Sequence, residues 1–180
     1  AEAAAHGKPR VLFSSHGLPK KVVKGGDPYQ WQCERTAEAI VQELDMPGLD
    51  WVSCYQSRVG PLEWIGPSTD SEIERAGADK VPLVVVPIAF VSEHSETLVE
   101  IEVEYRELAH EKGVPHFVRV PTVGVEDSFI QGLAGLVRRA LAGEVAMCSQ
   151  AGGRICPDGF QGCPQRARQQ TSRQFPVGGQ

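Results

Sequence analysis

The sequence predicts an α/β protein with an open, mostly parallel four-stranded sheet flanked by helices. Four apolar, β-branched runs alternate with segments of helical spacing, which is typical of repeated strand–helix units. The third run, 80–90, is the most apolar, as expected of a central strand covered on both faces. With 180 residues, the chain is long enough for one domain with a buried core.

The expected strands are 10–17, 49–60, 80–90 and 115–124. The first ends in turn residues, and the second is followed by a Gly- and Pro-rich loop. Two prolines, Pro82 and Pro87, conflict with the third strand because each removes a donor from the hydrogen-bond ladder.

The expected helices follow the strands. Segment 29–46 has helical spacing after a loop at 18–28, and 68–78 forms a short helix with Ser68 or Thr69 as its N-cap. An acidic helix follows the third strand and ends at about Lys112. The last helix, 126–141, carries basic residues in its final turn, where they complement the helix dipole.

This pattern divides the chain into three parts. Residues 1–9 are expected to be a linker, and residues 10–142 form the α/β domain. Residues 143–180 lose all periodicity and are expected to be a flexible, cysteine-containing tail. The chain begins without methionine, so we expect it to be part of a longer protein.

Composition excludes several classes of protein. A net charge of −5 argues against a nucleic-acid partner. No apolar run approaches the roughly 20 residues that cross a bilayer, and no charged-then-apolar segment at the start of the given sequence indicates a secretory signal. The cysteine count is 5, an odd number that argues against a disulfide framework and favours a cytoplasmic protein with a possible metal site.

Polar residues gather where the strands end, and ligands of open α/β sheets bind at the carboxyl ends of the strands. His16 follows the first strand, while His94 and Glu96 follow the third, so we expect the three to face one crevice. Two imidazoles and a carboxylate can hold a divalent metal, and a neutral imidazole can accept protons. The alternative is a strand-end histidine bonded to backbone, or His94 capping its helix.

The acidic helix carries Glu96, Glu100 and Glu104 at i, i+4 and i+8, and Glu93 lies close to the same stripe. The simpler interpretation is that these glutamates only form a solvated face of the helix. The alternative is a ladder of unneutralised carboxylates that conducts a cation or protons.

Two further residues follow the second strand. Trp64 either packs against neighbouring residues or provides a flat aromatic surface for a flat ligand. Arg58 pairs with a ligand carboxylate, or with Glu63 or Asp70. The remaining histidines, His6, His110 and His116, are expected to be isolated surface residues.

The tail cysteines, Cys148, Cys156 and Cys163, do not have zinc-ribbon spacing. Three thiolates are one short of the four that a [2Fe–2S] centre requires. Unligated cysteines are the alternative.

These segments together resemble the ferrochelatases, which insert ferrous iron into a porphyrin. The resemblance rests on "VLFSSHGLPKKVVKGGDPYQ", "YQSRVGPLEWIGPSTD" and "VPIAFVSEHSETLVEIEVEY", in that order, and extends from about residue 10 to 141. It implies a Rossmann-like domain of the chelatase type, the C-terminal one of two similar domains. The missing N-terminal half would then be a partner, with porphyrin and ferrous iron as substrates. The resemblance leaves membrane contact and the choice of porphyrin open.

The resemblance also implies residue roles. His16 and Glu96 match the iron-binding pair, His94 matches the neighbouring histidine, and Glu100 and Glu104 match an acidic path for metal or protons. The wall of the porphyrin cleft would comprise Gln56, Ser57, Arg58 and Trp64.

The implied mechanism is that His16 accepts pyrrole protons and that metal arrives through Glu96 with His94. Trp64 would help to hold a bent ring, whose distortion exposes the nitrogen lone pairs. This chain alone is expected to be inactive, because half of the cleft is absent.

Some family members bind a [2Fe–2S] cluster through a C-terminal extension, which "GGRICPDGFQGCP" resembles. A fourth ligand would come from the missing half, from Cys33 or from elsewhere. Two alternative functions are left open. One is a chelatase for another metal and tetrapyrrole, such as cobalt, and the other is a non-catalytic tetrapyrrole- or metal-binding module.

Overall fold

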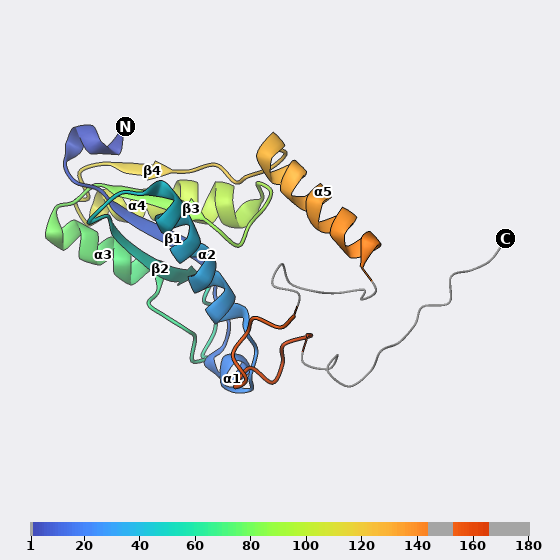
Figure 1. Cartoon of the computed structure of the whole chain (residues 1–180). Helices are drawn as coiled ribbons and strands as arrows, with labels where there is room; N and C mark the ends of the chain where they lie inside the picture. The colour runs from blue at the N-terminus through green and yellow to red at the C-terminus, as the bar shows by residue number, and fades with distance from the viewer. Residues whose placement is uncertain (1, 144–152, 166–180) are drawn as a thin grey trace.

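The computed structural model describes residues 2–143 and 153–165. Its centre is a four-stranded sheet in the order β2-β1-β3-β4, and every neighbouring pair is parallel (Figure 1). The strands are β1 (Arg10–His16), β2 (Asp50–Gln56), β3 (Leu83–Pro87) and β4 (Phe117–Arg119). The predicted parallel sheet is therefore confirmed, although the last three strands are shorter than expected.

The two prolines in the third apolar run explain where β3 begins and ends. Pro82 lies just before the strand, and its carbonyl accepts a hydrogen bond from the Arg10 amide at 2.9 Å. Pro87 is the last residue of the strand. Neither proline interrupts the ladder, because both lie at positions where a missing N–H is tolerated.

Helices cover both faces of the sheet (Figure 1). One face is covered by α2 (Tyr29–Leu44). The other is covered by α3 (Thr69–Asp79) and by the continuous pair η2 (Glu96–Tyr105) and α4 (Arg106–Glu111). The last helix, α5 (Asp127–Ala142), leads away from the sheet.

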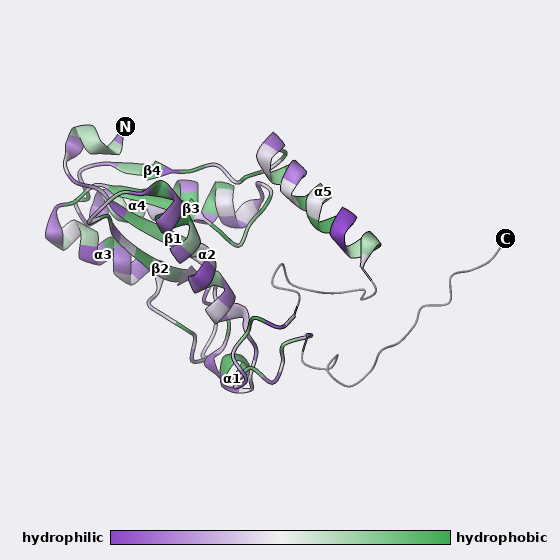
Figure 2. Cartoon of the chain, viewed as in Figure 1, coloured by the Kyte–Doolittle hydropathy of each residue, from purple (hydrophilic) through white to green (hydrophobic). Residues whose placement is uncertain are grey.

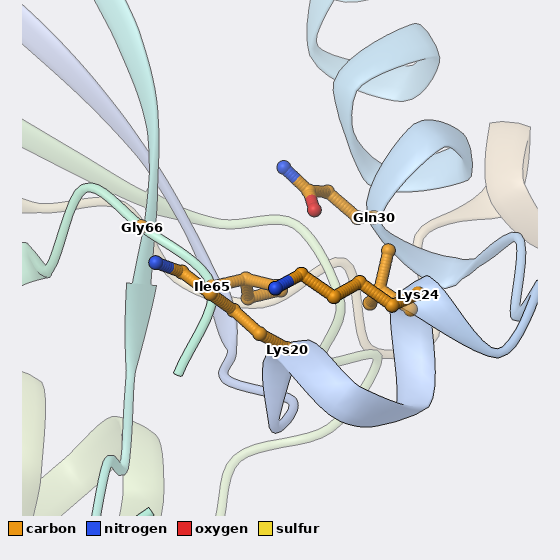
Figure 3. A pocket seen from close by; sticks show the side chains of 6 residues that line it. Lys20, Lys24, Gln30, Ile65 and Gly66 are labelled. Carbon is orange, nitrogen blue, oxygen red and sulfur yellow. The ribbon is translucent and has the colours of Figure 1, made fainter. Parts of the chain in front are cut away.

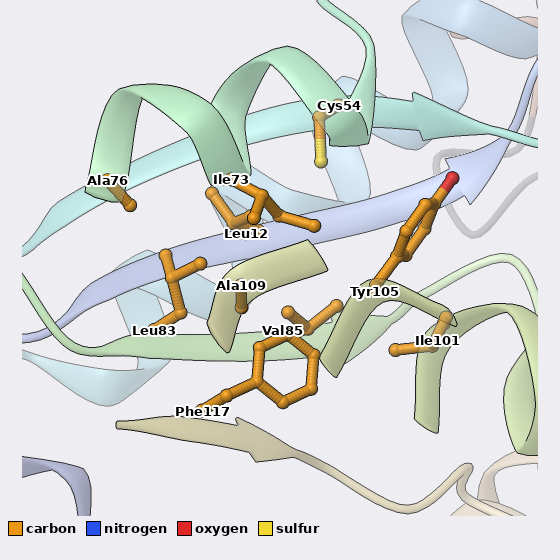
Figure 4. Close-up of a cluster of buried hydrophobic side chains, with 10 residues drawn as sticks. All are labelled: Leu12, Cys54, Ile73, Ala76, Leu83, Val85, Ile101, Tyr105, Ala109 and Phe117. Carbon is orange, nitrogen blue, oxygen red and sulfur yellow. The ribbon is translucent and has the colours of Figure 1, made fainter. Parts of the chain in front are cut away.

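The strand β1 supplies residues to two hydrophobic clusters. Leu12 belongs to the larger cluster beneath α3, η2 and α4, and Val11 and Phe13 belong to the smaller one beneath α2. Figure 4 shows the buried members of the larger cluster: Leu12, Cys54, Ile73, Ala76, Leu83, Val85, Ile101, Tyr105, Ala109 and Phe117. Each large apolar side chain in such a core contributes about 1.5–3 kcal/mol to folding.

The observed helices agree in part with those predicted from the sequence. Ser68 caps α3, as expected, by accepting a hydrogen bond from the Ser71 amide at 3.1 Å. A short helix, α1 (Lys20–Lys24), lies in the segment predicted to be a loop. Five residues are too few to show helical periodicity, so this helix could not be predicted from the sequence pattern. In the predicted linker, η1 (Ala3–His6) forms one 3-10 turn.

The acidic helix differs from the prediction in its type. Its first part, η2, is a π-helix, and the α-helical part begins only at Arg106. The buried positions Thr97, Ile101 and Tyr105 recur every four residues. Either kind of helix keeps such positions on one face, so the pattern could not distinguish them. Among soluble proteins, π-helices are rare and are frequent at functional sites.

Two of the histidines expected to be isolated contact each other near the amino ends of the strands. The rings of His6 and His116 stack at 4.2 Å, and Nε2 of His116 lies 2.9 Å from Oε1 of Glu2. His110 is exposed, as predicted.

Part of the predicted flexible tail is folded against the domain. The Gly162 amide donates to the Gly26 carbonyl at 2.9 Å, and the Trp31 and Phe160 rings lie 6.1 Å apart. Gly26 has a φ of +97°, and a Cβ on it would lie 2.7 Å from the Gln161 nitrogen. Glycine is therefore required at this contact. Across the described residues, no helix is long and apolar enough to cross a membrane.

Candidate active site at the carboxyl ends of the strands

The predicted site residues lie where the chain direction across the sheet changes. From β1 the chain moves outward to β2 and then returns past β1 to β3, so the carboxyl ends of β1 and β3 flank a topological switch point. Open α/β sheets bind ligands at this point. His16 ends β1, Gln56 ends β2 in register with it, and the loop after β3 leads to η2.

Glu96 at the start of η2 brings the two histidines together. Its Oε1 lies 3.2 Å from Nδ1 of His16, and its Oε2 lies 2.9 Å from Nδ1 of His94. All three side chains are partly open, with exposed fractions of 42%, 38% and 35% for His16, Glu96 and His94. The predicted convergence of the three residues is confirmed.

Local contacts hold His94 against Glu96. The Glu96 amide donates to Nδ1 of His94 at 3.2 Å, and the Phe90 ring lies 5.0 Å from the imidazole. An Nδ1 that accepts this bond presents its lone pair near a carboxylate oxygen. Two electron-rich atoms at that distance repel each other unless a proton or a cation lies between them. A proton or a cation between the imidazole and the carboxylate would remove this repulsion.

The His16 loop is positioned by close packing. The Gly17 amide donates to the Gln56 carbonyl at 2.8 Å, and a Cβ on Gly17 would lie 2.9 Å from that same oxygen. Only glycine lets the two strand ends approach so closely. On the α2 side, the Tyr29 hydroxyl donates to the His16 carbonyl at 3.0 Å. Burial raises the pKa of Tyr29, so this hydroxyl remains a donor.

Glu100 has a very different environment. One of its oxygens accepts from the Ser57 amide at 2.6 Å and from the Tyr105 hydroxyl at 3.0 Å. The other accepts from Ser57 Oγ at 2.5 Å and from Gln56 Nε2 at 2.9 Å. A carboxylate has about four acceptor positions, so Glu100 is saturated. Burial, and then the charge of Glu100, raises the pKa of Tyr105, which keeps its hydroxyl protonated.

Gln56 connects the strand ends to η2. Its Oε1 accepts from Ser14 Oγ at 2.7 Å, and its Nε2 also donates to the Glu96 carbonyl at 2.9 Å. The residue is fully buried, with 0% exposure. It therefore does not face a ligand in this structure, contrary to its predicted place on a cleft wall. Ser57 beside it adopts a left-handed φ of 58°, which its bonds to Glu100 hold in place.

The alternative of a ladder of unneutralised carboxylates does not hold for Glu93. Nη1 of Arg119 on β4 lies 2.8 Å and 3.0 Å from its two oxygens, and Thr97 Oγ1 donates to it at 2.7 Å. Burial opposes the charge on Glu93, but hydrogen bonds from Thr97, Arg119 and the Thr122 amide lower the pKa of this carboxyl. Glu102 also pairs with Arg119, at 3.0 Å, whereas Glu104 is exposed.

Sequence reasoning missed Arg119 and Tyr105 as parts of this site. One signal was available for the first, because Arg119 is the only charged residue in the apolar run 117–121. Tyr105 gave no signal, since a tyrosine at a buried helical position is expected from packing alone.

The residues predicted for the porphyrin wall lie beside the His16 loop. Pro19 and Trp64 form an isolated antiparallel bridge, and the indole Nε1 of Trp64 is buried without a hydrogen-bond partner among the described residues. Arg58 is exposed, and Glu63, one of its two expected partners, instead contacts Lys20 at 2.7 Å.

A small hollow of about 250 Å³ lies close to this wall, between α1 and the loop that follows Trp64 (Figure 3). It is lined by Lys20, Val23, Lys24, Gln30, Ile65 and Gly66. Neither imidazole nor Glu96 lines it, so it is separate from the histidine pair.

Two of the three tail cysteines meet in the folded part of the tail. Cys156 and Cys163 are buried, and burial together with the neighbouring Cys163 thiol raises the pKa of Cys156. Cys33 lies elsewhere, beside Ser15 and Tyr29, and Cys148 is outside the described residues. The described residues thus offer two adjacent sulfur ligands, half of what a [2Fe–2S] cluster requires.

The described part of the chain contains no group of three or more His, Cys, Asp or Glu side chains arranged to enclose a metal ion. The two imidazoles contact opposite oxygens of Glu96, which gives a row of ligands and not a cage.

Comparison with known structures agrees with this fold. A cobalamin (vitamin B12) biosynthesis CbiX protein from Marinobacter aquaeolei superimposes with a TM-score of 0.55 at 17% identity, over 74% of this chain and 98% of that one. At that identity the likeness concerns the fold alone. The fold is therefore an open α/β domain with a row of two histidines and one glutamate at the carboxyl edge of its parallel sheet.

Sequence comparison identifies the family. The family model described as ferrochelatase matches residues 1–141, and the chain belongs to the ferrochelatase family. A ferrochelatase of Hyphomonas neptunium is 50% identical over 94% of this chain, and one of Caulobacter vibrioides is 52% identical over 87%. These matches cover 47% and 45% of the two relatives, so the chain spans about half the length of the curated relatives that it matches.

Proposed function

We propose that this chain is the metal-site half of an enzyme that inserts ferrous iron into a porphyrin. The observation that carries the proposal is the placement of both Nδ1 atoms, of His16 and of His94, against the single carboxylate of Glu96. Metallation exchanges two pyrrole protons for one Fe²⁺ ion, so the site must handle both protons and a metal. Imidazole and carboxylate groups can do both at cellular pH.

In this proposal His16 accepts pyrrole protons, and ferrous iron arrives as a substrate through Glu96 with His94. The site holds an entering ion by few ligands because the four porphyrin nitrogens must replace them. A complete protein cage would retain the metal. The open row of ligands supports transfer over storage, which disfavours a non-catalytic metal-binding module.

We further propose that Trp64 and Arg58 contact the macrocycle directly. Both lie beside the His16 loop, where Trp64 offers a flat ring and Arg58 an exposed guanidinium for a porphyrin carboxylate. Gln56 and Ser57 would lie behind these two residues and would not touch the macrocycle, since their side chains are bonded to Glu100.

The acidic path for metal or protons also remains a proposal. Glu104 is exposed at the far end of η2, where a hydrated cation can reach it. Glu100 lies between Glu104 and Glu96 along the helix, but its four bonds make it a fixed negative charge on that route.

The remaining half of the porphyrin cleft is proposed to come from the part of the relatives that this chain does not match. The chain alone is then expected to show no metallation. A cytoplasmic location is proposed as well, in keeping with thiols that are free among the described cysteines.

A [2Fe–2S] cluster is proposed only for the full-length protein. Cys156 and Cys163 would supply two ligands and Cys148 a third. Cys33 is unsuited to be the fourth, because it packs beside Ser15 and Tyr29. Iron and acid-labile sulfide analysis, with absorption spectra of the anaerobically purified protein, tests this assignment.

The test of the function uses the full-length protein and the substitution His16→Ala. We expect iron insertion to fall by about 10²-fold or more, as for the loss of a general base, with porphyrin binding retained. The matched control is His110→Ala, an exposed histidine on α4 that should leave turnover unchanged. Unchanged turnover in the His16 variant would remove this residue from the mechanism.

The metal is tested separately. Wild-type turnover with Fe²⁺, Co²⁺ and Zn²⁺ under anaerobic conditions should be highest for Fe²⁺ with a porphyrin acceptor. A clear preference for Co²⁺ would support the cobalt chelatase alternative instead.

A further inference from the structure

The face of β1 that carries Leu12 changes from apolar to polar two residues before His16. Hydrophobic residues occupy the middle of the inner strands β1 and β3 (Figure 2), yet the next residue on this face is Ser14, opposite Cys54 of β2. Ser14 has an exposed fraction of 0%. A buried hydroxyl costs free energy unless it is hydrogen-bonded, so an apolar side chain is the ordinary occupant of such a position. The Ser14 hydroxyl therefore needs partners, and the structure provides them.

These partners lie on β2 and at the start of α3. Ser14 Oγ donates to Gln56 Oε1 at 2.7 Å, and Thr69 Oγ1 lies 3.0 Å from the same serine oxygen. Beyond it, Cys54 Sγ lies 3.3 Å from Thr69 Oγ1. Gln56 and Thr69 are 0% exposed, like Ser14, so none of the three faces a ligand in this structure. Together with Cys54 they form a buried chain of hydrogen-bonding groups.

The number of hydrogens fixes the direction of this chain. Gln56 Nε2 donates to the Glu96 carbonyl and to Glu100 Oε2, each at 2.9 Å, and both of these oxygens are acceptors. With the amide turned over, its own oxygen would face both of them and be repelled, so Gln56 Oε1 must face Ser14. The single hydrogen of the Ser14 hydroxyl is thus used on Gln56, and Thr69 must donate to Ser14.

The thiol of Cys54 completes this order. Burial, the largest cause, raises the pKa of Cys54 to about 12, so the thiol keeps its hydrogen. Thr69 gives its own hydrogen to Ser14, which leaves the thiol as the donor across the 3.3 Å to Thr69 Oγ1. Each hydroxyl then donates once and accepts once. A buried network that is satisfied in this way holds its members in one arrangement.

We propose that Ser14 is a positioning residue for Glu96, and that Thr69 holds the Ser14 hydroxyl in the orientation that this requires. Ser14 fixes the Gln56 amide, and Gln56 holds the backbone of Glu96. The Glu96 carboxylate is thereby kept between the two imidazoles. This inference rests on the proposed function, in which that carboxylate receives the metal.

The clamp at Glu100 does not replace this contact. Three of the four hydrogen bonds that Glu100 accepts come from other groups and persist if the Gln56 amide rotates. The bond from Gln56 to the Glu96 carbonyl depends on the orientation of that amide, which Ser14 sets. Loss of the Ser14 hydroxyl should therefore release Glu96 while Glu100 stays bound.

The test compares two substitutions of Ser14 in the full-length protein. Ser14→Ala removes the hydroxyl and should lower kcat for iron insertion by about tenfold at unchanged KM for the porphyrin, because a displaced group slows the chemical step. Ser14→Thr keeps the hydroxyl but adds a methyl group to a buried position, so it should lower the melting temperature while kcat stays within about twofold of the wild type. Turnover that follows stability, and not the hydroxyl, would overturn the proposal.

The matched control is Ser15→Ala. Ser15 is the next residue on β1, is 1% exposed and points to the opposite face, where its side chain hydrogen-bonds to Cys33. Its loss should leave kcat unchanged. Equal falls in kcat for the two alanine variants would show a general weakening of the strand and contradict the assignment.

Thr69 provides an independent pair of variants in case those of Ser14 fold poorly. Thr69→Val keeps the shape of the side chain but removes the hydrogen that Ser14 accepts, and should lower kcat by about threefold. Thr69→Ser keeps that hydrogen and should retain the wild-type kcat. The same kcat for both Thr69 variants would reject the chain.

Crystal structures of the Ser14 variants separate this inference from the proposed function, because they measure no turnover. The distance of 3.2 Å between Glu96 Oε1 and His16 Nδ1 should increase by about 1 Å in Ser14→Ala and be kept in Ser14→Thr. A displaced Glu96 in a protein whose wild type inserts no iron would reject the proposed function alone. An unmoved Glu96 in Ser14→Ala would overturn the positioning role, whatever the activity.

Discussion

The open start of η2, around Glu96, and its clamped middle, around Glu100, differ although they lie about one turn apart on the same helix. Glu96 faces two imidazoles and is partly open to solvent. Glu100 accepts four hydrogen bonds from groups that all belong to the protein. One carboxylate remains partly open to solvent, whereas the acceptor positions of the other are all occupied.

The glutamates along one helix face therefore need not share one function. Glu100 fixes the position of η2 on the end of β2, and Gln56 connects that clamp to the backbone of Glu96. These bonds therefore hold the open end of the helix in place through its next turn. Activity and stability should consequently separate between the two positions.

The sharpest test of this separation is Glu96→Gln in the full-length enzyme. We expect iron insertion to fall by about a thousandfold, because the amide cannot carry the charge that attracts a cation between the imidazoles. The melting temperature should stay within error of the wild type, because the Glu96 side chain is 38% exposed. Steady-state turnover and calorimetry measure the two quantities. A loss of stability without a loss of turnover would invert the roles assigned to the two glutamates.

The next largest effect is expected for Glu100→Ala. This change leaves the Ser57 amide and the Tyr105 hydroxyl without an acceptor and removes one of the two acceptors of Gln56 Nε2, which should lower the free energy of unfolding by about 2–3 kcal/mol. Urea denaturation of the purified protein measures the loss. The control is Glu107→Ala, an exposed glutamate on α4 that should change stability by less than about 0.5 kcal/mol. Similar stabilities of the two variants would show that the clamp does not hold η2.

The smallest effect concerns Glu93 and pH. Its folded-state pKa is below the ordinary value of 4.5, so its pairing with Arg119 stabilises the fold above that value. The contribution is lost as the pH falls through the lowered pKa, where the carboxyl becomes protonated in the folded protein too. Glu93→Gln should therefore lower stability near neutral pH, by less than about 1 kcal/mol for a partly exposed pair, and not in strong acid. A stability difference that is the same at all pH values would contradict this.

Individual strands and helices show which parts of the fold could be predicted from the sequence. The strands β1 and β3 were predictable because they are apolar, and β4 ended earlier than expected because Pro121 cannot donate to a ladder. The helix α1 was missed because it is too short to display a period. At the site, His16, Glu96 and His94 were predictable since the carboxyl ends of parallel strands must meet at one edge.

The sequence alone was enough to predict the α/β sheet, the edge at which the candidate site lies and the two histidines and one glutamate that meet there. Hydrophobic periodicity and the order of strands suffice for this. Only the three-dimensional contacts show that Glu100 is saturated, that Arg119 neutralises Glu93 and that the described residues leave the apolar face of α5 uncovered. Those outcomes depend on partners far away in the chain, whose approach no local pattern encodes.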